Sequence, residues 1–182
     1  MNLLLVNTLR LQPALLALAL ILLSIISNAQ LEYRKALSNT IKIKLPPVFK
    51  FMEANVLSTK YLSKNMPTEV YTNEAATVNV AFNKTQQMLK EQKVFTESKK
   101  LEQQLTSNGK VQLISSEQAS VNNSNISIFS FYSNAIDTKV YNVTFIFSLK
   151  GKMVVGSFNC TIALQSQWQS TAYKIIRSIK EI

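Results

Sequence analysis

Residues that could perform chemistry are scarce in this chain of 182 residues. It contains a single cysteine, Cys160, no histidine and ten acidic residues. A serine or cysteine nucleophile needs a neighbouring base, most often histidine, to remove its proton. No serine lies in a Gly-x-Ser-x-Gly sequence, the turn that exposes the nucleophile of many hydrolases. The sequence therefore predicts no catalytic residue and no enzyme, with a lysine or tyrosine catalyst as the alternative.

The acidic residues do not form the patterns that acid–base catalysis or metal binding requires. Most are glutamates near lysines in predicted helices, as Glu97 is near Lys100, and solvated helix faces explain them. The one aspartate, Asp137, lies in a predicted turn. Zinc sites favour histidine and cysteine, and calcium loops need closely spaced carboxylates. Because the chain also has only three glycines and no phosphate-binding glycine motif, we expect neither a metal ion nor a cofactor.

The amino-terminal segment has the pattern of a secretory signal peptide. Arg10 is its only charged residue, an apolar run extends from Ala14 to Ile26, and small residues, Ser27 and Ala29, stand at the −3 and −1 positions. The run has 13 residues, whereas a helix needs about 20 to span a bilayer. We therefore expect cleavage before Gln30, export to the periplasm or the medium, and no stable membrane span afterwards. An uncleaved membrane anchor is the alternative.

Removal of residues 1–29 as a signal peptide would leave 153 residues, a common size for one domain. Residues 30–40 are polar and weakly patterned, so they predict a flexible leader. Residues 41–182 are then expected to form a single domain. One cysteine cannot form an internal disulfide, and we expect Cys160 to be a small apolar residue of the core. An intermolecular disulfide or a reactive thiol is the alternative.

The chain is basic, with 20 lysines and arginines against 10 acidic residues and a net charge of +10. The basic residues are spread along the sequence, and only Arg34 and Arg177 after residue 29 are arginines. Because nucleic-acid recognition favours the planar fork of arginine, we expect no nucleic-acid partner. A diffuse lysine surface suits anionic lipid headgroups or an acidic protein partner. A surface that serves only solubility is the simplest alternative.

Hydrophobic periodicity predicts helices near both ends of the presumed domain and strands between them. A tight turn at Lys150-Gly151 predicts an antiparallel hairpin, and Ser166 is the expected first residue of the last helix. The helix starting at Asn83 is expected to bury Met88. Strands are predicted at 41–45, 69–72, 77–82, 111–115, 126–133, 139–149 and 153–163, and helices at 54–64, at 83–106 and from 166 onward.

Two stripes of apolar residues indicate where the core lies. In the predicted hairpin one face would hold Tyr141, Val143, Phe145 and Phe147, and the other face is mixed. The last helix would bury Trp168, Ala172, Ile175, Ile176 and Ile179 at helical spacing. The expected fold class is α+β, an antiparallel β-sheet flanked by helices on both faces.

A set of short motifs follows this order of elements through the chain after residue 29: Leu45-Pro46-Pro47, Lys60-Tyr61 through Met66-Pro67, Val70-Tyr71-Thr72, Asn79 through Asn83, Phe158-Asn159-Cys160, Trp168 and Arg177 through Lys180. Together they resemble the PsbP/DcrB-like superfamily, bacterial envelope members above all. The resemblance implies an α/β/α sandwich and accessory or protein-binding work without catalysis. A metal-handling role is not implied, since the chain has no histidine.

Two functional hypotheses follow. The first is a non-enzymatic envelope protein that binds another protein through a lysine-rich face or an exposed sheet edge. The second is a carrier of a small apolar ligand or lipid, held between sheet and helix and lined by Phe131, Tyr132, Phe145 and Phe147. Ordinary core packing would also account for these four aromatic residues.

Overall fold

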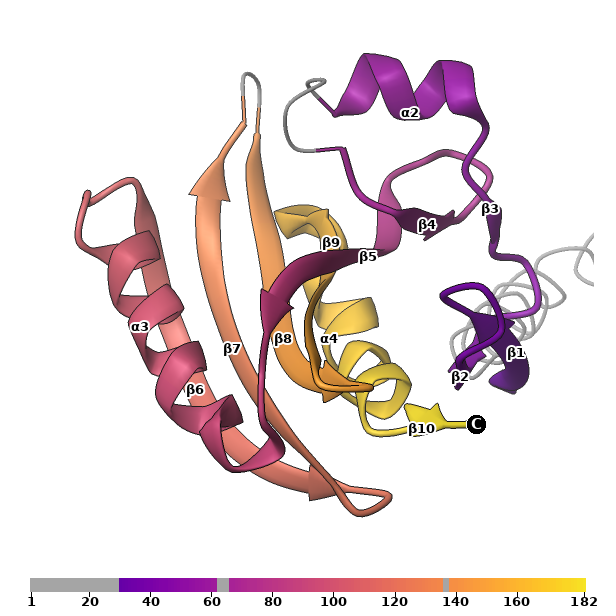
Figure 1. The fold of residues 1–182 in the computed structure, drawn as a ribbon. Coiled ribbons are helices and arrows are strands. Elements are labelled where there is room, and N and C mark those ends of the chain that lie inside the picture. Colours follow the sequence, from indigo (N-terminus) through magenta and orange to yellow (C-terminus); the bar gives the residue numbers. More distant parts are fainter. Residues whose placement is uncertain (1–29, 62–65, 136–137) are drawn as a thin grey trace, which may run out of the picture. The chain divides into compact units, whose positions relative to one another are not determined.

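Seven strands form an antiparallel sheet at the centre of the structure, a computed structural model that describes residues 30–61, 66–135 and 138–182. The order across the sheet is β3 (Lys50–Phe51), β4 (Glu69–Thr72), β5 (Val78–Met88), β9 (Lys152–Thr161), β8 (Lys139–Leu149), β7 (Ser124–Asn134) and β6 (Val111–Val121). Strands that follow each other in the sequence mostly pair, and the pairing of β5 with β9 brings the two halves of the chain together (Figure 1).

Two-residue turns set the register of two hairpins. Lys150 and Gly151 connect β8 to β9 with positive φ angles of 51° and 75°, which confirms the predicted hairpin. Asn122 and Asn123, at 49° and 67°, connect β6 to β7 in the same way. Both pairs suit a turn with φ above zero at each central residue, whose twist matches that of the flanking strands.

One face of this sheet carries the main core. Tyr141, Val143 and Phe145 are fully buried and Phe147 is 2% exposed, as the period of two predicted. Helix α4 (Gln165–Ile176) packs on this face, with Ala172, Ile175 and Ile176 fully buried. Trp168 is partly buried and its ring lies 5.5 Å from Phe49 and 6.4 Å from Phe158. The apolar stripe of the last helix is therefore confirmed as far as Ile176, and Ile179, 4% exposed, lies beyond the end of the helix.

Close packing inside this core depends on Gly156. It lies opposite Phe82 on β5 and Phe145 on β8, and the two rings meet edge to face with centroids 5.8 Å apart. A Cβ atom at Gly156 would lie 2.1 Å from the Phe145 ring. The glycine thus leaves the space in which the two aromatic rings touch.

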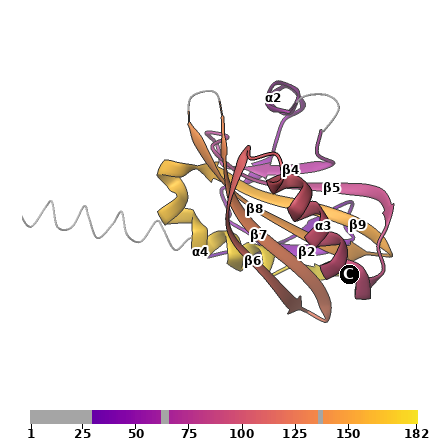
Figure 2. The same ribbon diagram turned by 90° about the vertical axis from the view of Figure 1, so that its left-hand side faces the viewer.

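The opposite face of the sheet is covered by two helices. Helix α3 (Val94–Thr106), preceded by the 3₁₀ turn η2 (Glu91–Lys93), covers a cluster that includes Phe129, Ile146 and Met153. Helix α2 (Ala54–Lys60) covers a smaller cluster around Val70. Figure 2 shows α3 and α4 on opposite sides of the sheet. The predicted fold class, an antiparallel sheet with helices on both faces, is confirmed.

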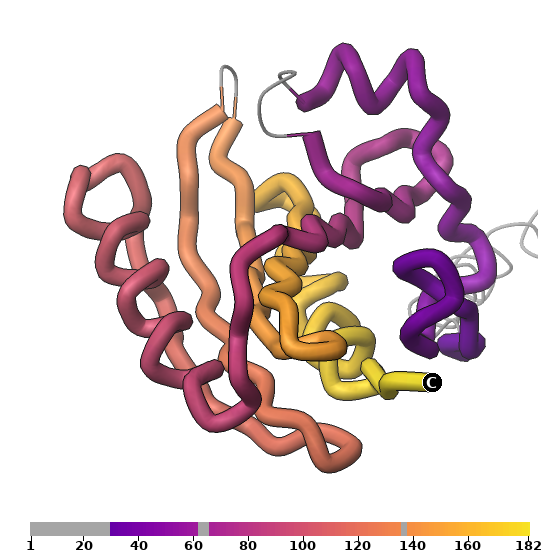
Figure 3. The backbone as a smooth tube through the Cα atoms, viewed as in Figure 1, coloured from indigo at the N-terminus to yellow at the C-terminus, as the bar shows by residue number. Residues whose placement is uncertain are grey.

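The expectation of a flexible leader at 30–40 is wrong. This segment contains strand β1 (Glu32–Ala36), which pairs with β2 (Ile41–Leu45), and β10 (Lys180–Glu181) pairs with the other side of β2 (Figure 3). The compact unit therefore begins at Leu31. The polar composition of β1 concealed it, because a strand at a sheet edge takes its backbone partners from a neighbour that sequence periodicity does not reveal.

The helix predicted over 83–106 begins later. Residues 83–88 continue β5 and pair with β9, so Met88 is 72% exposed instead of buried. Helix α4 likewise begins at Gln165 after the 3₁₀ turn η3 (Ile162–Leu164), and Ser166 is not its capping residue. At residues 83–88, pairing with β9 outweighed the local sequence signals that favour a helix. The predicted helix 54–64 is observed to Lys60, and 62–65 lie outside the described residues.

Candidate binding surfaces

One cluster of ionisable side chains contains a tyrosine hydroxyl and a carboxylate in direct contact, a pair that could transfer a proton. The Tyr71 hydroxyl donates a hydrogen bond to Glu69 Oε1 at 2.5 Å, and the backbone N–H of Leu37 donates to Glu69 Oε2 at 2.9 Å. Burial and the Glu69 carboxylate raise the pKa of Tyr71 well above its usual value. Both carboxylate oxygens are therefore occupied by groups of the protein itself.

The same cluster holds a strained turn between β1 and β2. Leu37, Ser38 and Asn39 all have positive φ angles, of 51°, 55° and 63°, a region that non-glycine residues avoid. The Arg34 guanidinium fixes the adjacent chain by donating to the backbone carbonyl oxygens of Pro47 and Phe49. The Leu37–Glu69 bond joins the three-stranded sheet of β1, β2 and β10, the small sheet, to β4 of the seven-stranded sheet, the large sheet, so the cluster has a structural role.

Cys160 lies in the main core, 1% exposed, as predicted from its lack of a partner. Burial raises the pKa of its thiol to about 11. The thiolate is the reactive form of cysteine, so this thiol is inert near neutral pH. The residue therefore packs as a small apolar side chain.

The remaining sequence predictions concern metals and the amino terminus. No group of three or more histidine, cysteine, aspartate and glutamate side chains gathers in the described residues. Among those residues there is also no helix of the length and apolarity that crossing a membrane requires. Ser27 and Ala29 of the predicted cleavage site lie outside the described residues, as does Asp137, and Gln30 is exposed.

The two edges of the large sheet differ in length and exposure. Strand β3 has two residues, whereas β6 has 11, and among the described strands β6 pairs only with β7. Leu113 and Ile114 on β6 are each 41% exposed, and a register shift leaves Ile114 as the extra residue of a bulge. Glu117 is the one charged residue of β6. Proteins usually protect an exposed edge with charged side chains, proline, a short strand or a bulge, and β6 has the bulge at Ile114 and the single charge of Glu117.

Side-chain hydrogen bonds on both faces connect β6 to the helices. Ser116 donates to Glu102 Oε2 of α3 at 2.5 Å, while Glu117 accepts from Arg177 at 2.8 Å at the end of α4. Burial alone would raise the pKa of Glu102, but hydrogen bonds from Lys99 and Ser116 and the Lys99 charge together lower it. The edge strand is thus ordered although its outer side has no neighbour among the described strands.

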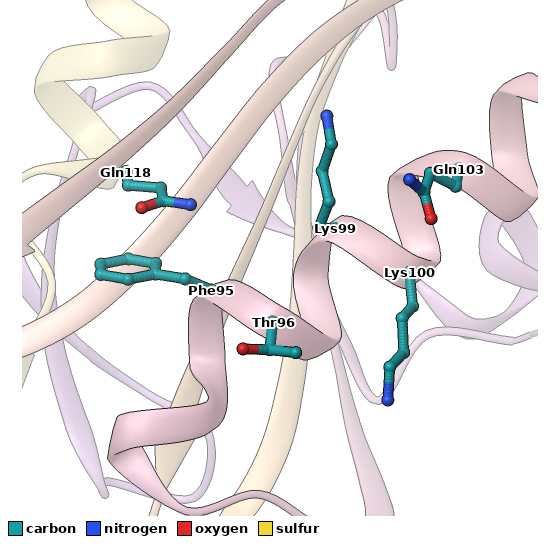
Figure 4. A pocket seen from close by; sticks show the side chains of 6 residues that line it. All are labelled: Phe95, Thr96, Lys99, Lys100, Gln103 and Gln118. Carbon is teal, nitrogen blue, oxygen red and sulfur yellow. The ribbon is translucent and has the colours of Figure 1, made fainter.

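A pocket of about 420 Å³ lies beside this edge, between α3 and β6. Figure 4 shows the Phe95 ring close to the Gln118 amide, with the Lys99 and Lys100 side chains pointing in different directions. Lys99 pairs with Glu102 at 2.5 Å and Lys100 with Glu97 at 2.8 Å. The apolar surface of the pocket, supplied by Phe95, therefore adjoins the ammonium groups of Lys99 and Lys100, which already pair with carboxylates. Its six lining residues are Phe95, Thr96, Lys99, Lys100, Gln103 and Gln118.

The four aromatic residues considered as the lining of an apolar ligand site do not face one cavity. Phe145 and Phe147 stack on each other in the main core, and Tyr132 packs against that core and donates to Gln165 at 2.8 Å. Phe131 lies on the other face and stacks on Phe129 beneath α3. Core packing accounts for all four.

Sequence reasoning missed most of the β6 surface. It predicted a strand over 111–115 only, because Ser115 to Ser120 contain no β-branched or aromatic residue. The edge position of the strand depends on the order of strands in space. A usable signal was present in Asn122-Asn123, a pair suited to a two-residue turn, which implies that the residues on both sides pair.

Comparison with known proteins gives the fold a precedent. No protein-family model and no curated protein sequence matches the chain significantly. Among solved structures, PsbP (CyanoP) from Synechocystis sp. PCC 6803 is similar with a TM-score of 0.60 at 8% identity, over 85% of this chain and 94% of that one. The Ran-binding protein Mog1p of Saccharomyces cerevisiae has a TM-score of 0.53 at 12% identity, over 84% and 96%. At these identities the likeness concerns the fold, and the chain has the PsbP-like α+β fold.

Proposed function

We propose that this protein is an exported, non-enzymatic binding protein that takes up an extended segment of a partner protein along β6. The observation that carries the proposal is the 11-residue edge strand, ordered on both faces and unpaired on its outer side among the described strands. An added strand forms backbone hydrogen bonds with such an edge, and its alternate side chains enter neighbouring pockets. The short β3 edge offers no comparable length.

The chemistry of β6 indicates what kind of segment would fit. Its exposed residues are uncharged, and Glu117, its one charged residue, is partly buried and already pairs with Arg177. Leu113 and Ile114 would contact apolar side chains of the partner, and the pocket at Phe95 and Gln118 would take a side chain that points toward α3. The expected partner segment is therefore extended, apolar in part and weakly charged.

Export of the protein is part of the proposal. The sequence pattern of residues 1–29 supports it, as does the start of the compact unit at Leu31, directly after the expected cleavage point. Mass spectrometry of the protein purified from its own envelope fraction tests this. We expect a chain that begins at Gln30; a chain that keeps residues 1–29 would contradict cleavage.

Binding by β6 is tested with two variants that add the same charge at exposed apolar positions. Ile114→Lys places a lysine on the β6 edge, and Val48→Lys, at a residue 61% exposed before β3, is the matched control. Both chains, starting at Gln30, are used as baits for the native envelope fraction, and bound proteins are quantified by mass spectrometry. We expect a partner that Val48→Lys retains and that Ile114→Lys loses roughly tenfold, the scale of a central contact.

Hydrogen exchange of the complex adds a second measurement. Amides of β6 should exchange more slowly when the partner is bound, because an added strand hydrogen-bonds the free edge. Equal recovery by both variants, or protection confined to other elements, would place the binding surface elsewhere. Recovery of a partner alone, without the difference between the variants, would not support the β6 proposal.

A further inference from the structure

A second surface of different chemistry lies on the small sheet. Residues of β2 alternate, so Ile41, Ile43 and Leu45 are fully buried in the main core while Lys42 and Lys44 point away from it. The neighbouring strands continue this outer face. It therefore belongs to a three-stranded sheet in which β2, the central strand, contributes the inner side to the core.

Three lysines lie in one row across this outer face. Lys35 on β1 and Lys180 on β10 are both register partners of Lys42 on β2. Side chains directly opposite on neighbouring strands have Cβ atoms about 5 Å apart, and like charges there destabilise the sheet. Lys44 follows on the same face of β2, opposite Tyr33. A row of this kind costs folding stability, which suggests that it is kept for binding.

The lysines of the row have no ion-pair partner in the part of the chain that the structure describes. Among the described residues, no carboxylate lies within 4.0 Å of the ammonium groups of Lys35, Lys42, Lys44 or Lys180. Glu181 lines the adjoining hollow of about 380 Å³ together with Lys42 and Lys180, but forms no ion pair with them. We call Lys35, Lys42 and Lys180 the small-sheet lysine row. The row and the neighbouring Lys44 are therefore available to an anionic partner.

Two residues at the margin of the row suit a lipid surface. Tyr33 is 58% exposed with the Lys44 ammonium 4.9 Å from its ring centroid, and Ile182 is 53% exposed. Tyrosine is enriched at the level of lipid headgroups, where its ring meets apolar chains and its hydroxyl meets water. Lysines beside such residues contact headgroup phosphates while their stems cover apolar surface.

An acidic protein would need carboxylates matched to the row, whereas a bilayer supplies anionic headgroups and an apolar layer together. The exposed Tyr33 and Ile182 beside lysines without ion-pair partners therefore favour a lipid surface over an acidic protein as the partner.

From these observations we propose that the small-sheet lysine row docks the protein on the anionic headgroups of a bilayer. The docking is peripheral and electrostatic, and it is separate from the β6 edge. A protein held at a membrane by one face would present β6 to partners of the same envelope. Each lysine near an anionic surface contributes about fivefold to partitioning, so binding should be reversible and sensitive to salt.

The test is co-sedimentation of the chain from Gln30 with vesicles of phosphatidylcholine, with and without phosphatidylglycerol. The row variant carries Lys35→Gln, Lys42→Gln and Lys180→Gln. Its matched control carries Lys93→Gln, Lys110→Gln and Lys139→Gln, three exposed lysines elsewhere, and has the same net charge. We expect wild type and control to bind vesicles that contain phosphatidylglycerol, the row variant to bind roughly 100-fold less, and 1 M salt to abolish the difference.

Three results would overturn the proposal. Equal binding to both kinds of vesicle would exclude headgroup charge as the attraction. Equal losses in the two triple variants would show that only net charge matters. Capture of an acidic protein by the row with no vesicle binding would assign the face to that partner. Thermal unfolding without vesicles provides the folding control, in which the row variant should be at least as stable as wild type because repulsion at Lys42 is removed.

Discussion

The two faces of the large sheet differ in what they bury, although the same strands build both. On the face toward α4, Tyr141, Val143 and Phe145 are fully buried and continuous with the inner side of the small sheet. On the face toward α2 and α3, Thr144 and Asn142 of the same strand are only half-buried. Neighbouring residues of one strand thus belong to a closed core and to a partly solvated surface.

Several polar residues of the second face bond to one another, although the buried Oδ1 atom of Asn79 has no hydrogen-bond partner among the described residues. Asn79, 1% exposed, donates to Asn159 at 2.9 Å across β5 and β9, and Asn142 donates to Ser133 at 3.0 Å. Apolar contacts on this face are confined to clusters beneath the helices. The comparison indicates that stability comes mainly from one face, while the other tolerates polar side chains.

The largest expected difference between the two faces is in the free energy of unfolding when adjacent residues of β8, Phe145 and Thr144, are each replaced by alanine. Phe145→Ala removes a fully buried ring and should lower the free energy of unfolding by about 3–5 kcal/mol. Thr144→Ala, directed to the other face, should change it by about 0.5 kcal/mol. Urea unfolding followed by circular dichroism measures both. Similar losses in the two variants would show that the faces contribute equally.

Gly156→Ala tests how closely the main core is packed. The added methyl group meets the Phe145 ring, and forcing extra volume into a filled core costs about 1–3 kcal/mol. Ser157→Ala, the next residue and directed to the other face, is the control and should be nearly neutral. In the double variant Gly156→Ala with Phe145→Ala, the clash is absent, so the loss should be smaller than the sum. Strict additivity would argue against the contact.

Glu102 of α3 packs over the second face and forms charged hydrogen bonds, whereas the polar pairs described above are neutral. Its side chain is 5% exposed and bonds to Lys99 and Ser116, so Glu102→Gln should cost about 1–3 kcal/mol at neutral pH. Because the pKa of Glu102 is lowered in the fold, its contribution is present above the ordinary glutamate pKa of about 4.3 and is lost as pH falls through the folded value.

The pH dependence checks the assignment to Glu102. Urea midpoints measured from pH 7 down to acid should fall less steeply for Glu102→Gln than for wild type, so that the two curves approach each other at low pH. Parallel curves would show that the charge of Glu102 does not stabilise the fold.

The smallest expected effect concerns an exposed ion pair of the same helix. Lys100 lies 2.8 Å from Glu97 with its side chain 61% exposed, and such pairs contribute about 0.5 kcal/mol or less. Lys100→Ala should therefore change the thermal midpoint very little, and added salt should remove the remaining difference. A loss as large as that of Glu102→Gln would show that exposure is not what separates the two pairs.

Sequence reasoning succeeded where one element contains its own signal. The alternation from Tyr141 to Phe147 and the turn at Lys150-Gly151 predicted the hairpin, and the apolar spacing after Trp168 predicted the face of α4. It failed at β1 and at the end of β5, whose residues are polar. Such strands form because a partner strand is present, and the partner lies far away in the sequence.

The same distinction between local signals and long-range contacts applies to the candidate surfaces. The sequence by itself determined the fold class, the burial of Cys160, the scarcity of catalytic side chains and the excess of lysine, since composition and local periodicity carry this information. Only the tertiary structure decided that β6 is a sheet edge and that Lys35, Lys42 and Lys180 share one row. Both facts depend on strand order and register, which arise from contacts between segments as distant as Lys42 and Lys180 and leave no periodic trace in either segment.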